Sequence, residues 1–314
     1  MIPEAFAAAT TNREGPAGTA WLATLPGIVE ELVDRWDCTP DGDWMHGEVG
    51  VIVPVQRSGE PLVLKVSFTH PGNVHEPDAY IAWAGRGAVH LHERADEYYA
   101  MLLERAHATT LRDSGADVAA VGGAMSRLLT IPAPDGRGAL GDAPGPRELP
   151  RLQDRADEWA AELAKDAAEF AGALPDVVVA RAFGAIDELV REQPDVLIHG
   201  DLHHRNILSA DREPWLAIDP KGLIGDPAYD AVTFLKARTL VLMKGDLLAG
   251  LEREFVAYCE AAELDKARVR RWIQLELVRT AYWVRRYGVG AVRRGDISQD
   301  PAVRMIDELA VNWA

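Results

Sequence analysis

The stretch Val196–Asp230 constrains this chain more than any other part of its sequence. Two short apolar runs, Val196–Ile198 and Trp215–Ile218, each end in polar residues. Apolar runs of this length, with turn-forming residues on both sides, are typical of buried short strands. Two carboxylates and an amide that emerge from adjacent buried segments suit Mg²⁺, because this hard ion prefers oxygen ligands. They also suit activation of a hydroxyl by the first aspartate. The three residues are Asp201, Asn206 and Asp219.

The same stretch resembles the catalytic and metal-binding segments of the aminoglycoside phosphotransferases, which are relatives of protein kinases. The kinase pattern H-R-D-L-x-x-x-N followed by D-F-G corresponds here to HGDLHHRN at His199–Asn206 and to DPKG at Asp219–Gly222. The longer segments HGDLHHRNIL and WLAIDPKGLIGDP are similar to the streptomycin 6-kinase and hydroxyurea-kinase branch of that family. The segments WDC, VIVPVQRSGEPLVLKV and MLLERA are similar to the same branch. The resemblance therefore extends from about Trp21 onward.

The resemblance implies an α+β, protein-kinase-like fold with two lobes, a small β-rich N-terminal lobe and a larger, mainly helical C-terminal lobe. We expect these domains at residues 1–103 and 104–314. The residues themselves predict a β-rich front half, because apolar runs at Glu48–Gln56 and Leu62–Phe68 flank a turn at Ser58–Glu60. A second hairpin is predicted from Val89–His92 and Tyr98–Leu103.

Helical spacing of apolar residues accounts for most of the remaining chain. A leader at Met1–Gly18 is expected to be loose or partly helical, and the Gly- and Pro-rich stretch Ile131–Pro150 to be a long surface loop. The predicted helices are Trp21–Trp36, Glu76–Trp83, Val118–Leu129, Asp154–Ala173, Asp176–Arg191, Ala228–Leu242, Leu247–Ala262, Asp265–Tyr287 and Asp300–Trp313.

Lys65 lies inside the apolar run LVLKV. A lysine there is costly to bury unless it is paired or bound to an anion, and the run alone leaves open an outward-facing strand lysine. The resemblance implies that Lys65 holds the nucleotide phosphates and pairs with a helix glutamate. Glu76, at the start of a predicted helix, is the candidate partner, and Glu93 is its rival.

Further nucleotide contacts follow only from the resemblance. It implies that the loop Asp41–Gly50, including Gly47, lies over the phosphates. It also implies that a hinge at Met101–Arg105, including Leu103 and Arg105, meets the adenine through its backbone. ATP is the implied phosphoryl donor. GTP stays open, because the loop lacks the G-x-G-x-x-G pattern.

The resemblance implies that Asp201 orients or accepts the proton of the acceptor hydroxyl. It also implies that Asn206 and Asp219 hold Mg²⁺. His199 is expected to be structural. A rival chemistry is a zinc-dependent hydrolase that uses His203 and His204 together with His199 and Asp201. That alternative leaves Lys65 and the DPKG segment without a role.

Four further residues are candidates around this centre. Asp230 is expected to brace the catalytic loop, whereas Asp226 is a candidate contact for a cationic substrate. Glu276 and Trp283 lie on a predicted C-terminal helix where the resemblance places the substrate wall. For Trp283, packing in the core is the favoured interpretation and a platform for a sugar ring is the alternative.

The charge and the cysteine content of the 314 residues limit which partners and which cellular location are expected. A formal net charge of −16 argues against a nucleic-acid or anionic-membrane surface, which needs basic patches, and suits a cationic small molecule. The two cysteines, Cys38 and Cys259, favour a reducing cytoplasm over a disulfide framework. We see no signal-peptide pattern and no apolar run long enough to cross a bilayer, so a cytoplasmic location is expected.

These features predict an ATP- and Mg²⁺-dependent O-phosphotransferase that acts on a small hydroxylated antibiotic. Streptomycin, at its 6-hydroxyl, is the expected acceptor, and an amino sugar or hydroxyurea is the alternative. A nucleotide-binding pseudokinase module is a second alternative. The presence together of Lys65, Asp201, Asn206 and Asp219 argues against that module, because a protein that only binds nucleotide needs no base.

Overall fold

The computed structural model of this protein describes residues 1–134, 148–288 and 300–313. The described residues form two compact units, each discontinuous in sequence. The first, here called the sheet unit, contains Met1–Gly115 and Arg205–Gly222. The second, the helical unit, contains residues 116–133, 149–204 and the described residues from 223 onward. Asn206 and Asp219 therefore belong to the sheet unit, although they follow the domain boundary predicted after residue 103.

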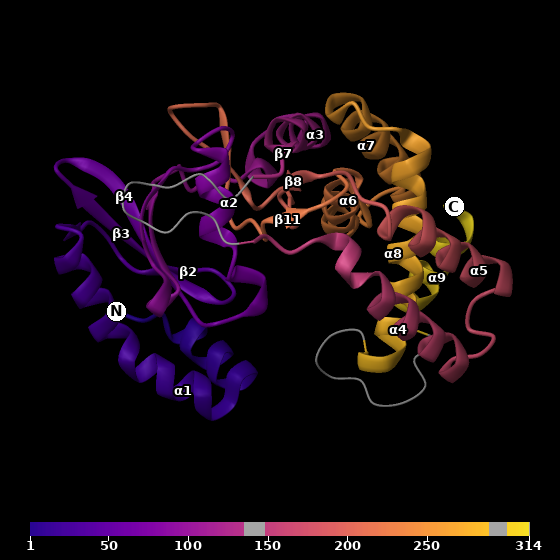
Figure 1. The fold of residues 1–314 in the computed structure, drawn as a ribbon, viewed down its shortest axis with the longest axis horizontal. Helices are drawn as coiled ribbons and strands as arrows, with labels where there is room; N and C mark the ends of the chain where they lie inside the picture. The colour runs from indigo at the N-terminus through magenta and orange to yellow at the C-terminus, as the bar shows by residue number, and fades with distance from the viewer. Residues whose placement is uncertain (135–147, 289–299, 314) are drawn as a thin grey trace. The chain divides into compact units, whose positions relative to one another are not determined.

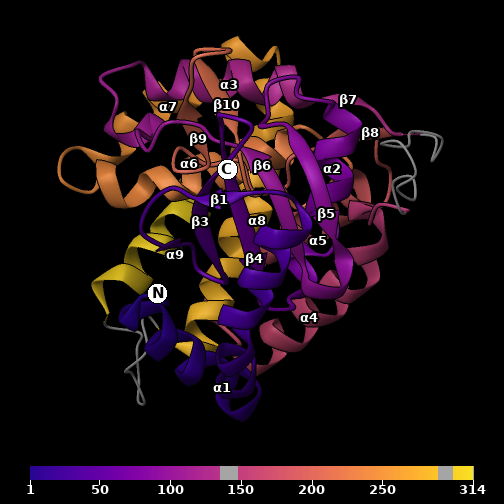
Figure 2. The ribbon, with the colours of Figure 1, turned by 90° about the vertical axis from the view of Figure 1, so that its left-hand side faces the viewer.

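A six-stranded antiparallel sheet forms the centre of the sheet unit, and Figure 2 shows its main strands side by side. The strand order is β1-β3-β4-β6-β5, with β2 paired to β3. Strands β3 and β4 are joined at Ser58 and Gly59, which both have positive φ, as a tight hairpin turn requires. The strands are β1 (Thr39–Pro40), β2 (Met45–His46), β3 (Gly50–Arg57), β4 (Glu60–Ser67), β5 (Leu91–Ala95) and β6 (Ala100–Glu104).

Helix α1 (Glu4–Arg35) packs on one face of this sheet (Figure 1). The helix is kinked at Gly15, whose φ is 61°, directly before Pro16, and a glycine adopts that conformation without a Cβ clash. The leader, predicted to be loose or partly helical, is helical from Glu4. The buried core between helix and sheet includes Phe6, Leu25, Leu32, Val53, Leu62, Leu64, Val66 and Leu102.

Side-chain alternation along β4 decides where its lysine goes. Leu62, Leu64 and Val66 belong to the core under α1. Because successive side chains of a strand point to opposite faces, Lys65 points away from that core. Helix α2 (Glu76–Trp83) supplies the partner that it meets there.

A short hairpin completes the sheet unit. Strands β9 (Ile207–Ser209) and β10 (Trp215–Ala217) are antiparallel, with Ile207 opposite Ala217. Asn206 directly precedes β9, and Asp219 follows β10 by two residues. The two polar residues therefore lie at the same open end of the hairpin.

The helical unit consists of a small sheet, in the order β11-β8-β7, and seven α-helices among its described residues. Helix α8 contacts α4, α5, α6, α7 and α9, which makes it the central helix. The elements are α3 (Val118–Leu129), β7 (Ile131–Pro132), α4 (Ala156–Glu169), α5 (Asp176–Ala185), β8 (Val196–Ile198), β11 (Leu223–Ile224), α6 (Ala228–Leu242), α7 (Leu247–Ala262), α8 (Lys266–Tyr287) and α9 (Pro301–Asn312).

The observed elements confirm the α+β class and most of the predicted helices. Helices α2, α3, α6 and α7 have the predicted bounds. The predicted helix Asp176–Arg191 instead changes to a π-helical turn at Ile186–Val190. The predicted loop Ile131–Pro150 lies largely outside the described residues, and its first two residues form β7.

Candidate active site

Lys65 is the centre of a group of charges in the sheet unit, and both Lys65 and Glu76 are buried. It lies within β4, opposite Ile52 and Met101, and its Nζ is 2.6 Å from Glu76 Oε1. The same ammonium group contacts the carboxylate of Asp219. The predicted pair with Glu76 therefore forms, whereas the rival Glu93 pairs with Arg57 at 2.7 Å.

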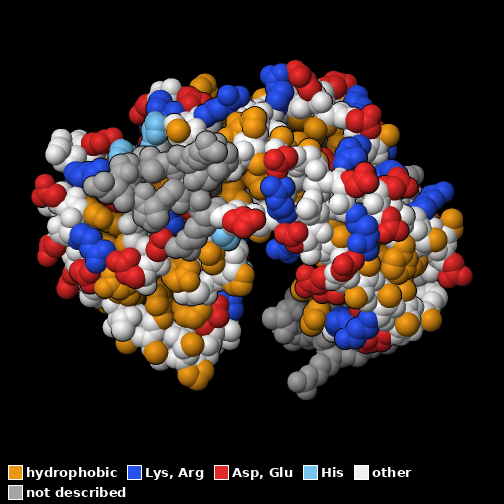
Figure 3. All heavy atoms as spheres, in the orientation of Figure 1, with side chains coloured by type: hydrophobic (Ala, Val, Ile, Leu, Met, Phe, Trp, Pro, Cys, Tyr) orange, Lys and Arg blue, Asp and Glu red, His pale blue; other side chains and the backbone are white. Residues whose placement is uncertain are grey.

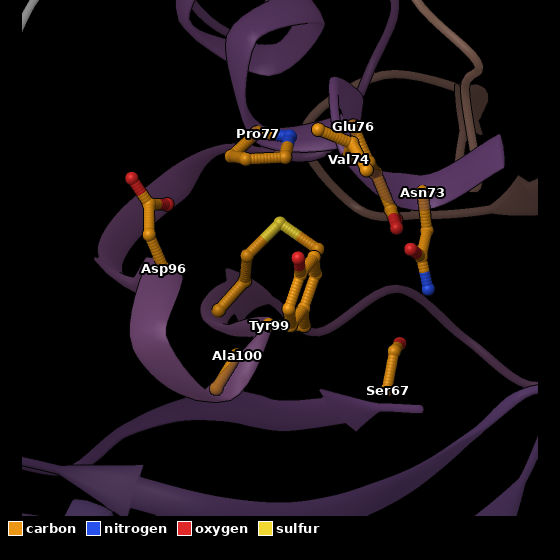
Figure 4. Close-up of a pocket in the computed structure, with 9 residues that line it drawn as sticks. Ser67, Asn73, Val74, Glu76, Pro77, Asp96, Tyr99 and Ala100 are labelled. Carbon is orange, nitrogen blue, oxygen red and sulfur yellow. The ribbon is translucent and has the colours of Figure 1, made fainter. Parts of the chain in front are cut away.

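The two carboxylates keep the lysine charged. Burial alone would lower the pKa of the Lys65 ammonium, but the negative charges of Asp219 and Glu76 outweigh it and leave that pKa raised. Burial raises the pKa of Glu76 to about 7, although the charge of Lys65 opposes this shift. Glu76 also borders a small cavity of about 20 Å³ (Figure 4), together with Ser67, Asn73 and Tyr99. A cavity of this size has room for about one water molecule.

Asn206 and Asp219 fit a divalent cation by chemistry and by placement. The backbone N–H of Ile218 donates to the Asn206 carbonyl at 2.9 Å, which fixes the two ends of the β9–β10 hairpin together. The Asp219 backbone has a φ of 59°, in the left-handed region that is uncommon for a residue with a Cβ. One amide oxygen and one carboxylate are ligands that Mg²⁺ prefers.

The loop that carries Asp201 follows β8 in the helical unit and is braced by a distant carboxylate. Asp230 accepts the backbone N–H groups of His199 at 3.0 Å and of Gly200 at 2.8 Å. Asp201 donates its own N–H to His199 Nδ1 at 3.2 Å. The bracing role predicted for Asp230 and the structural role predicted for His199 both agree with these contacts.

Burial raises the pKa of Asp230 to about 7, against the opposing effect of the N–H donors from Gly200 and His199. The negative charge of Asp201 adds to the shift. The brace is therefore a carboxyl group that gains a proton more readily in the folded protein than in the unfolded chain.

A cavity of about 290 Å³ opens beside Asp201 within the helical unit. A second cavity of about 660 Å³ shares Lys236 and Glu276 with it and extends along α4 and α8. Drug-sized ligands occupy pockets of roughly 300–1,000 Å³. The polar residues around the smaller cavity are Asp201, His203, Tyr229, Thr233, Lys236 and Glu276.

Within these cavities the chain's own cations neutralise its carboxylates. Glu276 pairs with Arg279 and lies 3.9 Å from Lys236 Nζ. Arg286 pairs with Asp166. The face of the helical unit seen in Figure 3 likewise shows acidic and basic side chains interspersed. The net charge of −16 therefore does not translate into an exclusively acidic cavity.

Trp283 is not part of the core. Its residue is 55 % exposed, its ring lies 5.4 Å from that of Tyr287, and both rings line the larger cavity with Glu276. The prediction that Trp283 packs in the core is wrong. Helical spacing along α8 does not show whether another element covers the ring.

The structure does not support the predicted contact of Asp226 with a cationic substrate. Its Oδ2 accepts hydrogen bonds from Arg268 Nε and Trp272 Nε1, each at 2.6 Å, and its Oδ1 accepts the N–H of Ala228 at 2.9 Å. The residue is buried and lines neither of these two cavities. Its carboxylate joins the start of α6 to α8, so it is not available to a cationic substrate.

The predicted nucleotide contacts outside the lysine cluster remain predictions. Leu103 is buried in β6, opposite Val63. The Arg105 side chain donates to the carbonyls of Leu62 and Val55 and pairs with Asp41 at 2.8 Å, so its guanidinium fastens strand ends.

Gly47 lies in the turn between β2 and β3. Its N–H donates to the Gly50 carbonyl at 2.9 Å, and no atom lies within 4 Å of the position that a Cβ would take. The predicted loop Asp41–Gly50 thus contains a short strand, β2, as well as a turn.

Sequence reasoning missed Tyr80. Its hydroxyl accepts the backbone N–H of Asp219 at 3.0 Å and lies 3.4 Å from Glu76 Oε1. Its position one helical turn after Glu76 places the two side chains on one face of α2, and this spacing was the available signal.

The zinc alternative finds no support in the described residues. Among them, no group of three or more His, Cys, Asp or Glu side chains is arranged to hold a metal ion. The histidines at 199, 203 and 204 therefore do not form a zinc site with Asp201. No described helix is both long enough and apolar enough to span a membrane.

Comparison with known proteins agrees with this geometry. Residues 35–288 match the family model described as aminoglycoside/hydroxyurea antibiotic resistance kinase. The chain is 35% identical to a streptomycin 6-kinase of Streptomyces glaucescens, over 96% of this chain and 94% of that protein. It is 33% identical to a hydroxyurea phosphotransferase of Kitasatospora aureofaciens, over 90% of this chain and 79% of that protein.

The fold is also similar to a solved structure. An aminoglycoside phosphotransferase in complex with ADP and hygromycin B superimposes with a TM-score of 0.52 at 16% sequence identity. The match covers 91% of this chain and 98% of the other. This likeness confirms the predicted protein-kinase-like fold.

Proposed function

The chain belongs to the aminoglycoside/hydroxyurea antibiotic resistance kinase family, and from this we propose that it transfers the γ-phosphoryl group of ATP to the 6-hydroxyl of streptomycin. It is a phosphotransferase of the kind that acts on small antibiotics. The observation that carries the proposal is the contact of the buried Lys65 ammonium with both the buried Glu76 and the partly exposed Asp219. Phosphoryl transfer depends on positioning and charge stabilisation, and this contact fixes a cation beside the proposed metal ligand.

In this proposal the sheet unit binds the nucleotide. Lys65, held by Glu76, contacts the phosphates, while Leu103, Arg105 and Gly47 belong to the adenine and phosphate segments. Asn206 and Asp219 would hold Mg²⁺, which when bound neutralises the charge of the phosphate oxygens. Asp201 accepts the proton of the acceptor hydroxyl as the new phosphate ester forms. A positioned general base of this kind contributes roughly 10²- to 10⁴-fold in rate.

The cavity beside Asp201, and the larger cavity that shares Lys236 and Glu276 with it, support a drug-sized acceptor. The space of about 660 Å³ along α4 and α8 is within the range of roughly 300–1,000 Å³ for drug-sized ligands, and hydroxyurea needs far less. Glu276 is our candidate for contact with a cationic group of streptomycin, and Trp283 offers an exposed ring on the same wall. Hydroxyurea or a simple amino sugar remains the alternative acceptor for the same catalytic groups.

A coupled ADP-release assay tests the proposal with streptomycin, other aminoglycosides, amino sugars and hydroxyurea as separate acceptors. We expect turnover with streptomycin, and a loss of about 10²- to 10⁴-fold in kcat for Asp201→Asn with ADP binding retained. Asp211→Asn is the matched control, because the Asp211 side chain is 95 % exposed. Turnover with hydroxyurea alone would mean that hydroxyurea, and not streptomycin, is the acceptor. ADP binding without turnover on any acceptor, unchanged in Asp201→Asn, would favour a pseudokinase module.

Glu276→Gln tests the acceptor contact separately. We expect KM for streptomycin to rise about tenfold, since a hydrogen bond to a charged group contributes about 1.5–3 kcal/mol, while kcat and KM for ATP stay within about twofold. Glu260→Gln is the control, because Glu260 pairs with Lys266 at the protein surface. An unchanged KM for streptomycin in Glu276→Gln would remove this residue from the acceptor site.

A further inference from the structure

Tyr80 connects the two acidic residues of the lysine cluster through one hydroxyl group. Its side chain is buried in α2, with the residue 1% exposed. The Oη atom accepts the backbone N–H of Asp219 at 3.0 Å and donates to Glu76 Oε1 at 3.4 Å. The sequence motifs include Glu76 and Asp219, which Tyr80 contacts, but they do not include Tyr80 itself. They therefore assign it no role in the site.

The contacts of Tyr80 close a ring. Glu76 contacts Lys65, Lys65 contacts the Asp219 carboxylate, and the Asp219 backbone contacts Tyr80, which returns to Glu76. Lys65 thus holds the side chain of Asp219, while Tyr80 holds its backbone. Two separate supports at one residue restrict both the position and the direction of its carboxylate.

The Asp219 backbone needs such a support. Its φ of 59° is in the left-handed region, where a Cβ is crowded against the backbone. The next residue, Pro220, has no N–H to donate, so the Asp219 N–H is the donor by which this turn is fixed to α2. A loop held in an uncommon backbone conformation persists when surrounding contacts determine it.

We propose that Tyr80 is a positioning residue for Asp219, and through it for the divalent cation that accompanies the nucleotide. This inference rests on the proposed function, in which Asp219 is a metal ligand. The hydroxyl group of Tyr80 positions Asp219. The ring packs in the core, with its centroid 6.5 Å from that of the Trp83 ring.

Tyr80→Phe isolates the hydroxyl, because the ring is kept. ADP affinity is measured by calorimetry on the full chain with saturating Mg²⁺ and with EDTA, and the ratio of the two affinities is compared between proteins. We expect this Mg²⁺ enhancement to fall about three- to tenfold in Tyr80→Phe, the equivalent of one hydrogen bond, with metal-free ADP affinity unchanged. An enhancement equal to that of the unmodified protein would overturn the proposal.

Tyr98→Phe is the matched control. It removes a tyrosine hydroxyl in the same unit, one that donates to Glu31 at 2.8 Å away from the lysine cluster, and it should leave the Mg²⁺ enhancement unchanged. A fall of the same size in both variants would mean general loosening of the sheet unit, and it too would overturn the positioning role.

Amide hydrogen exchange supplies a readout that needs neither metal nor acceptor. In Tyr80→Phe the Asp219 amide should exchange at least about tenfold faster, because its acceptor is gone. The Ile218 amide, which donates to the Asn206 carbonyl, should not change. If Tyr80→Phe does not fold, hydrogen exchange of the unmodified protein still tests the proposal. An Asp219 amide that exchanges there as fast as a free chain would contradict the proposal, and slow exchange would support it.

The two proposals can fail separately. None of these measurements uses an acceptor, so a chain that phosphorylates no antibiotic could still show the effect of Tyr80 on Mg²⁺-dependent ADP binding. Conversely, normal streptomycin turnover with an unchanged Mg²⁺ enhancement in Tyr80→Phe would leave the function and remove the positioning residue.

Discussion

At the scale of single residues, Asp230 links the catalytic loop to the protonation state of a buried group. Its carboxyl accepts two backbone N–H groups of the loop that carries Asp201. Burial nevertheless raises its pKa from 3.8 to about 7. A carboxyl whose pKa is higher in the folded state stabilises the fold at low pH and loses that contribution as pH rises through its folded pKa.

We therefore predict that the stability difference between the unmodified protein and Asp230→Asn depends on pH. The asparagine copies the shape of the protonated acid but cannot titrate. Relative to Asp230→Asn, the unmodified protein should lose unfolding free energy between about pH 4 and pH 7, as Asp230 becomes charged. Urea unfolding of both proteins across this range measures the difference. A difference that grows in favour of the unmodified protein with rising pH would contradict the pKa direction.

The sequence predicted some site residues and missed others for physical reasons. Lys65 within an apolar run demands a partner, and Glu76 at the start of the next helix was the nearest suitable acid, so the pair could be expected. The roles of three other residues depend on which element packs against which face of a helix. These residues are Asp226, Tyr80 and Trp283. Spacing along one helix does not contain that information, because it is set by residues far away in the sequence.

At the scale of elements, long amphipathic helices were predicted better than their interruptions. Helices α3 and α7 begin after Asp117 and Asp246, whose side chains accept an N–H of the first turn, and such N-caps are visible in a sequence. The π-helical turn at Ile186–Val190 has no local signal, since its residues continue an ordinary helical pattern. The kink of α1 at Gly15 was likewise concealed in an Ala- and Thr-rich segment.

Close packing of α3 against α7 gives a prediction at this scale. A Cβ at Gly123 would lie 2.3 Å from the backbone oxygen of Tyr258, whereas a Cβ at Gly184 in α5 would meet no atom within 4 Å. Gly123→Ala should destabilise the protein by about 1–3 kcal/mol, because a backbone oxygen cannot rotate away. Gly184→Ala should be neutral or stabilise by up to about 1 kcal/mol. Chemical unfolding compares the two, and equal effects would contradict the packing of α3.

At the scale of the whole molecule, charge acts on the encounter with the acceptor. A net charge of −16 would attract a cationic antibiotic from a distance, whereas Glu276 and Asp166 in the two cavities are already paired with Arg279, Lys236 and Arg286. We therefore expect the overall charge, rather than these paired carboxylates, to supply the long-range attraction.

Ionic strength separates these contributions. We predict that kcat/KM for streptomycin falls severalfold between about 10 mM and about 300 mM salt, because the Debye length shortens over that range. The value for ATP, which is an anion, should stay level or rise over the same range. Steady-state kinetics with each substrate varied in turn measures both. A streptomycin value that does not respond to salt would contradict attraction by the net charge.

The central claim is the identity of the acceptor and of its reacting hydroxyl. The most direct measurement is the structure of the product formed from streptomycin and ATP, located by two-dimensional ¹H–³¹P NMR. Our account predicts a single monophosphate whose phosphorus couples to the proton on the carbon that bears the 6-hydroxyl, and no product with Asp201→Asn. Phosphorus at another hydroxyl, or no streptomycin phosphate while hydroxyurea is phosphorylated, would contradict it.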